Sequence, residues 1–156
     1  MTRGFLMGST VVSVAIMLPL IMLISAVYYL LSAKVVGSDI GFGKWFAFAL
    51  WTSVPALLLV PAGIIKILMT SNGQLTQQAM NPLSLNELLL HLPLSSPWSG
   101  LANAIHIPSI WAAVVAIIGY KLWTAKSTLT STVVVLLPLA VIYGGWAAFV
   151  MAFGAS

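Results

Sequence analysis

Long apolar runs, interrupted by short polar stretches, dominate the pattern of this sequence. Four runs predict helical spans, over about 5–31, 45–68, 108–123 and 130–153. A helix needs roughly 20 consecutive apolar residues to cross a bilayer, and the third run is the short one, about 24 Å by helical rise. A start near Asn103 would lengthen it. The pattern therefore predicts an all-α, polytopic transmembrane helical bundle, with residues 1–156 forming a single domain.

The segment 81–97, between the second and third runs, carries the signature of one short helix. Ser84 and Glu87 have the spacing of a capping box, in which each side chain bonds a free backbone amide. The apolar face that follows comprises Leu85, Leu88, Leu89 and Leu92. Pro93 ends the helix, and about eight residues cannot cross a bilayer. We expect a helix that lies in the membrane interface; a packed loop helix covering the bundle end is the alternative.

Proline and small residues mark the predicted spans. Prolines remove a backbone hydrogen bond within a helix and are expected to kink it at Pro19, Pro55, Pro61 and Pro138. Small side chains allow close helix contact in lipid. Such residues recur at helical spacing in the first and third runs, at Gly4, Gly8, Ser9, Ser13, Ala112, Ala116 and Gly119. The sequence leaves open whether these faces pack within one chain or between chains.

Composition supports the membrane assignment. The chain is 61% apolar and 5% charged, with a mean hydropathy of +1.11. Soluble domains carry roughly 25% charged residues, because their surface faces water. The formal charge of +4 results from six cations and two acids. The cations are scattered at the edges of apolar runs, so they indicate membrane flanks and no nucleic-acid partner. The absence of Cys excludes disulfides and thiol chemistry.

The distribution of cations predicts the orientation. With four spans, Lys34, Lys44, Lys121 and Lys126 fall on one side, and Arg3 and Lys66 fall on the other. Short loops rich in Lys and Arg remain in the cytoplasm. We therefore expect the loops 32–44 and 122–129 to be cytoplasmic, and both termini and the loop 69–106 to face outside.

Candidate chemistry is sparse. No ionisable side chain lies near the centre of a predicted span, where functional groups of intramembrane enzymes and proton-coupled transporters are usually found. Asp39 and Glu87 lie in loops, and His91 and His106 without a nearby thiol or carboxylate make a poor metal site. The glycines of the segment 37–44 lack the preceding strand and the spacing of a nucleotide loop. The sequence predicts no catalytic site, cofactor or metal.

Several segments together resemble a known family. They are Gly41-Phe-Gly-Lys-Trp-Phe46, Trp51-Thr-Ser-Val-Pro55, Asn81-Pro-Leu-Ser-Leu-Asn-Glu-Leu88 and the third span from Ser109 to Thr124. In this order they resemble the bacterial branch of the YIP family, membrane proteins named for interaction with Ypt/Rab GTPases in eukaryotes. The resemblance covers nearly the whole chain. It implies an all-helical, multi-span membrane protein, which in bacteria would lie in the inner membrane.

The resemblance also implies five spans after a cytoplasmic amino-terminal segment, whereas this sequence predicts four. The first predicted span is similar to the family's second, so the first family span is expected to be missing. Removing one span from a protein whose amino terminus is cytoplasmic leaves an outward amino terminus. This agrees with the orientation predicted from the cations.

Pattern, composition and resemblance together favour a non-enzymatic membrane scaffold or adaptor. It would act through helix–helix contacts with itself or with other membrane proteins, in membrane organisation or trafficking-like processes, and its other partners would be membrane lipids. A small oligomeric channel or transporter is the alternative. Polar side chains such as Thr52 and Ser53 could line its path, although the sequence shows no charged ring or selectivity element.

Overall fold

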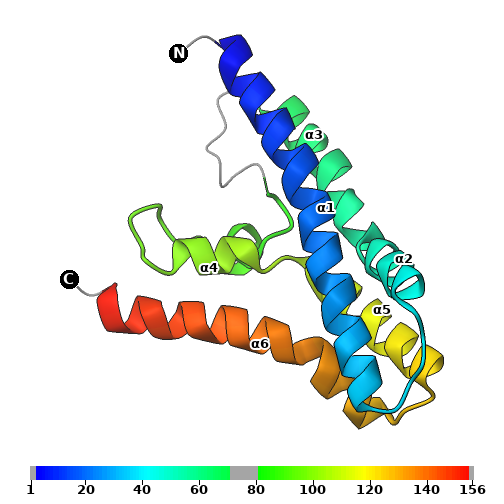
Figure 1. Ribbon diagram of the computed structural model, residues 1–156. Helices are drawn as coiled ribbons and strands as arrows, with labels where there is room; N and C mark the ends of the chain where they lie inside the picture. Colours follow the sequence, from blue (N-terminus) through cyan, green and yellow to red (C-terminus); the bar gives the residue numbers. More distant parts are fainter. Residues whose placement is uncertain (1–2, 71–80, 155–156) are drawn as a thin grey trace. The chain divides into compact units, whose positions relative to one another are not determined.

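The computed structural model describes residues 3–70 and 81–154; near the amino terminus it describes side chains at 8, 9 and from 12 onward. No strand occurs among these residues, and one antiparallel bridge joins Ser84 to His106. The structure consists of α1 (Arg3–Val35), α2 (Phe42–Thr52), the 3-10 helix η1 (Val54–Leu58), α3 (Leu59–Met69), the π-helix η2 (Asn86–Leu90), α4 (Ser99–Ala104), α5 (Ile107–Thr124) and α6 (Thr128–Phe153) (Figure 1). The predicted all-α class is confirmed.

Four segments are long and apolar enough to cross a membrane, which confirms the predicted number of spans within the described part of the chain. They are Val12–Val35, Phe42–Met69, Ile107–Thr124 and Thr128–Phe153. Few side chains in each of them are buried within the structure, and many strongly apolar ones are exposed. An apolar surface of this extent suits hydrocarbon and would be unfavourable in water.

The second span is not one regular helix. It passes from α2 through the 3-10 turn η1 into α3, and Pro55 occupies the start of that turn. Proline supplies no backbone N–H, so the helical ladder changes where Pro55 enters it. Pro61 lies in the first turn of α3, where backbone N–H groups have no partner within the helix. Pro19 lies inside α1, and Pro138 lies inside α6. The kinks predicted at these four prolines stay predictions.

An upstream start of the third span near Asn103 is wrong. Asn103 belongs to the separate helix α4, and the chain is extended at Ile105 and His106 before α5 begins. His106 forms a capping box with Ser109: the Ser109 N–H donates to His106 Nδ1 (3.1 Å), and the His106 N–H donates to Ser109 Oγ (3.2 Å). This cap fixes the first residue of the span because it satisfies amides that a longer helix would bond internally.

The chain forms two compact units, residues 1–51 and 52–156. In the first unit, α1 and α2 meet through aromatic rings. The ring of Tyr29 stacks on that of Trp45 (centroids 5.9 Å apart) and meets that of Phe48 edge-on (4.9 Å). Trp45 and Phe48 are themselves in edge contact (5.3 Å). Edge-to-face and offset contacts at these distances are the favourable geometries for aromatic pairs.

In the second unit, α5 packs against α6 and η1, and α4 packs against η2 and α6 (Figure 1). A glycine favours close contact between α4 and α6, because a Cβ at Gly100 would lie only 3.1 Å from the Trp146 ring. The Tyr143 hydroxyl also donates to the Ala104 carbonyl (3.4 Å). These contacts hold the non-spanning helix α4 against α6. The single domain predicted for residues 1–156 stays a prediction.

Candidate functional site

The most distinctive site lies where the 81–107 segment meets the start of α5. The backbone of this segment is pinned to the start of the span by two hydrogen bonds on either side of the Ser84–His106 bridge. The Leu85 N–H donates to the Ile105 carbonyl (2.8 Å), and the Ile107 N–H donates to the Leu83 carbonyl (3.0 Å). The second bond also satisfies one amide of the first turn of α5, which has no partner within the helix.

Polar side chains reinforce this attachment. Ser84 is fully buried; its Oγ donates to Asn103 Oδ1 (3.1 Å) and accepts from the Glu87 N–H (3.2 Å). Asn103 Nδ2 donates to the Ser99 carbonyl (2.8 Å), and Asn81 Nδ2 donates to the Asn103 carbonyl (3.1 Å). Buried polar groups need such partners because leaving them unpaired is costly. The network therefore fixes η2 relative to α4 and α5.

A second set of hydrogen bonds ends η2. Asn86 is 3% exposed, and its Oδ1 accepts from the Leu92 N–H (2.8 Å) while its Nδ2 faces the Leu92 carbonyl (3.4 Å). The chain leaves the helix at His91, which adopts a left-handed φ of 49°. The prediction that Pro93 ends the helix is therefore wrong. Asn86 and His91 turn the backbone two residues earlier.

The predicted capping box at Ser84 and Glu87 is only half formed. Ser84 Oγ accepts from the Glu87 N–H as expected, but the Ser84 N–H donates to the Asn81 carbonyl. The Glu87 carboxylate instead pairs with Lys66 of α3, with 3.6 Å between Oε2 and Nζ. A tertiary partner of opposite charge thus competes successfully with the local cap. No sequence pattern points to this pair, because the two residues are 21 positions apart.

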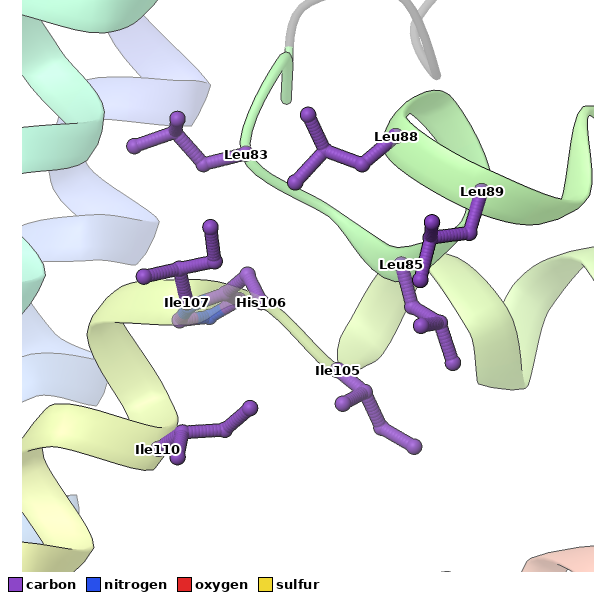
Figure 2. A pocket seen from close by; sticks show the side chains of 8 residues that line it. All are labelled: Leu83, Leu85, Leu88, Leu89, Ile105, His106, Ile107 and Ile110. Atoms are coloured by element: carbon purple, nitrogen blue, oxygen red, sulfur yellow. The ribbon is translucent and has the colours of Figure 1, made fainter.

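The leucines of this region open onto an apolar groove of about 290 Å³. Figure 2 shows leucines of the loop and η2 on one side, and residues of the α5 entry on the other. The lining residues are Leu83, Leu85, Leu88, Leu89, Ile105, His106, Ile107 and Ile110. Three of the four leucines predicted to share an apolar face line the groove; Leu92 does not. The helix is shorter than predicted, and its location in the membrane interface stays a prediction.

Among the described residues that line the groove, His106 is the one with an ionisable side chain. Burial lowers the pKa of its imidazole below the usual value of 6.5, because removal from water disfavours the charged form. The neutral ring suits its structural task, since Nδ1 must keep a lone pair to accept from the Ser109 N–H. His91 lies in the turn that follows η2, and no group of three or more His, Cys, Asp or Glu side chains gathers within 3–70 and 81–154.

The small residues predicted to mediate helix contacts fall into two groups. On α1, Gly8, Ser9 and Ser13 are exposed, whereas the side-chain environment of Gly4 lies outside the described residues. On α5, Ala116 is buried (3% exposed) in the helix that packs against α6 and η1, and Ala112 and Gly119 are half-buried. Ala116 therefore contributes to packing within the chain.

Sequence reasoning missed a second small-residue face on α1. Ala26 and Ala33 are fully buried and share one helical face with Tyr29. The signal was available in principle, since the two alanines are seven residues apart on either side of an aromatic residue. It was hidden because alanine is common in apolar spans, and only the folded structure shows which alanines are enclosed.

Comparison with known families places the chain in a family of multi-span membrane proteins. The Yip1 domain matches residues 1–149. The chain therefore belongs to the Yip1 domain family, as the resemblance of its loops and spans predicted. No curated protein and no solved structure matches it. The bacterial branch and the missing first span stay predictions.

Proposed function

We propose that this protein is a non-enzymatic membrane scaffold that acts through helix–helix contacts with a second copy or with other membrane proteins. Membership of the Yip1 domain family supports a multi-span membrane role. The observation that carries the proposal is the exposed small-residue surface at the amino-terminal end of α1, where Gly8, Ser9 and Ser13 lie. Added side-chain volume would meet nothing at Gly8, since no atom lies within 4 Å of its Cβ position.

Small residues matter more in a membrane than in water. Lipid chains are as apolar as leucine, so burial of apolar area drives helix association only weakly in a bilayer. Association depends on close backbone approach and dense packing, which glycine and serine permit. The exposed leucines, isoleucines and valines farther along α1 suit contact with lipid chains instead. The end of α1 that carries Gly8 is thus the better candidate for a protein partner.

The proposal is tested by Gly8→Ile, with Gly144→Ile as the matched control. Both glycines are helical, and neither has an atom within 4 Å of its Cβ position. We expect cross-linked complexes, purified from native membranes and identified by mass spectrometry, to be lost in Gly8→Ile and kept in Gly144→Ile. Complexes that survive Gly8→Ile unchanged would exclude α1 as the contact surface. A homo-oligomer without other proteins, combined with solute flux, would favour the channel alternative.

We also propose that the loops 32–44 and 122–129 face the cytoplasm and that the loop containing η2 faces outside. The cations Lys34, Lys44, Lys121 and Lys126 support this orientation. Since the chain has no Cys, single substitutions provide unambiguous labels. Ser95→Cys should react with an impermeant maleimide in intact cells, and Asp39→Cys only after permeabilisation. The opposite labelling would reverse the orientation.

A further inference from the structure

The groove beside η2 is an apolar surface that the described part of the chain leaves open. Seven of its eight lining residues are leucine or isoleucine. Several stay well exposed: Leu88 is 43% exposed, Ile107 53% and Ile110 58%. Figure 2 shows that these side chains approach the same space from two segments that are distant in sequence. The hydrogen-bond network around Ser84 and Asn103 holds both segments in place, so the shape of the groove is set by the fold.

The ends of two spans lie beside the groove. Ile107 is the first residue of the span formed by α5, and Lys66 lies in the last turn of α3, which ends the second span. Glu87 pairs with Lys66 and immediately precedes Leu88 of the groove. The groove also continues into the exposed face of α5, where Trp111, Val114 and Ile118 follow Ile110. On a spanning helix, that face is in contact with lipid chains.

We propose that the groove holds an acyl chain of a membrane phospholipid as a bound ligand. Its volume of about 290 Å³ exceeds that of an apolar cavity of about 150 Å³, which is large enough to bind benzene. The groove can therefore accept a run of methylene groups. Its lining consists of branched aliphatic side chains and His106, whose Nδ1 is occupied by the helix cap. This surface complements a hydrocarbon chain and presents little to bind a polar solute.

The ion pair at the edge of the groove selects the headgroup. Lys66 and Glu87 place a positive and a negative charge 3.6 Å apart, and their side chains are 39% and 26% exposed. A zwitterionic headgroup carries a phosphate and an ammonium group, which complement Lys66 and Glu87 respectively. A headgroup with only negative charge would satisfy Lys66 but would be repelled by Glu87.

The test uses a bimane fluorophore on a single cysteine of the otherwise Cys-free full chain. Ile110→Cys reports on the groove, and Met151→Cys is the control. The two positions match in exposure (58% and 65%), and both lie within a turn of a span end, on the antiparallel helices α5 and α6. The quencher is phosphatidylcholine with a nitroxide on its acyl chain, at increasing mole fraction in unlabelled phosphatidylcholine vesicles.

If an acyl chain is bound, quenching of the Ile110→Cys label should rise at low mole fraction of the quencher and then saturate. Quenching of the Met151→Cys label should instead rise as expected for random contact with lipid. Leu88→Phe fills the groove with apolar volume and should remove the excess quenching at position 110 without changing the control. Circular dichroism and detergent unfolding curves check that each variant is folded. Equal quenching at both positions overturns the proposal, as does an excess that survives Leu88→Phe.

The headgroup is tested with the same label. Nitroxide-labelled phosphatidylcholine should give a larger saturable quenching than nitroxide-labelled phosphatidylglycerol, and Glu87→Gln should reduce the difference. A preference for phosphatidylglycerol in the protein that keeps both Lys66 and Glu87 would overturn the assignment of the zwitterionic headgroup. Neither result depends on the partner contacts proposed for α1, because the described lining residues all fall between 83 and 110.

Discussion

Two regions of this protein are held together by different forces. The α1–α2 pair of the first unit is fastened by the rings of Tyr29, Trp45 and Phe48, with small residues beside them. In the second unit, the segment from Asn81 to Ile107 is fastened mainly by hydrogen bonds from serine and asparagine side chains. Both regions contain fully buried side chains, Trp45 in the first and Ser84 in the second.

The difference follows from the surroundings of each region. Within the spans, backbone groups are satisfied inside each helix, so side chains only need to pack closely. Between the spans, the 81–107 segment has few regular elements, and its backbone groups need partners from elsewhere. Short polar side chains supply those partners. We therefore expect the stability of the first region to depend on ring packing, and that of the second region to depend on hydrogen bonds from polar side chains.

The largest expected effect is on the aromatic contact. Trp45→Ala removes a fully buried ring that contacts Tyr29 and Phe48, so we expect a loss of about 3 kcal/mol of unfolding free energy. Trp51→Ala on the same helix is the control, because Trp51 is 73% exposed and its loss should change stability by about 0.5 kcal/mol or less. Unfolding in mixed micelles of increasing SDS fraction measures both. Similar losses for the two variants would contradict a ring-packed hairpin.

The next effect concerns the turn after η2. Asn86→Leu keeps the side-chain size but leaves the Leu92 N–H without its acceptor, and we expect a loss of about 1–3 kcal/mol. Asn86→Asp retains an acceptor for that N–H, and a protonated carboxyl at about pH 4 can also donate to the Leu92 carbonyl in place of Asn86 Nδ2, so at that pH it should cost less than Asn86→Leu. The same SDS titration, with hydrogen exchange of the Leu92 amide, separates the variants. Equal losses would mean that shape, and not the amide, sets this turn.

A pH dependence should also distinguish the second region. The pKa of His106 is lowered in the folded protein by burial, so above pH 6.5 the ring is neutral in both states and the cap is at full strength. As the pH falls from 6.5 towards the lowered pKa, the unfolded chain takes up the proton first and stability decreases. Thermal unfolding in detergent between pH 7.5 and 5 should show this loss. His106→Asn keeps a capping acceptor and should remove this part of the dependence.

The smallest effects concern one turn in each unit. Gly37 after α1 and Ala125 after α5 both adopt a left-handed backbone, with φ of 79° and 53°. Only glycine adopts this conformation without steric cost. Gly37→Ala should therefore destabilise the protein by about 1 kcal/mol, and Ala125→Gly should stabilise it by about 0.5 kcal/mol. Thermal midpoints measured in one detergent test both signs; two changes of the same sign would contradict this explanation.

Much of the fold was predictable because the bilayer imposes a length and a composition on each span. The four predicted runs agree with the four candidate spans to within a few residues at most of their ends. The candidate site was less predictable. The leucine face of η2 followed from helical spacing, but the ion pair of Glu87 and the early turn at Asn86 and His91 depended on partners distant in sequence or on left-handed backbone.

The sequence by itself determined the class of the protein, the number of spans and the absence of a regular strand pattern, since hydrocarbon tolerates only apolar helices of sufficient length here. Tertiary structure decided which small residues are buried: Ala26, Ala33 and Ala116 are enclosed, while Gly8 and Ser13 are exposed. It also decided that Leu83 and Ile110 line one groove. Apolar side chains in a span look alike in sequence, and only the position of a neighbouring helix or loop separates those that face protein from those that face lipid.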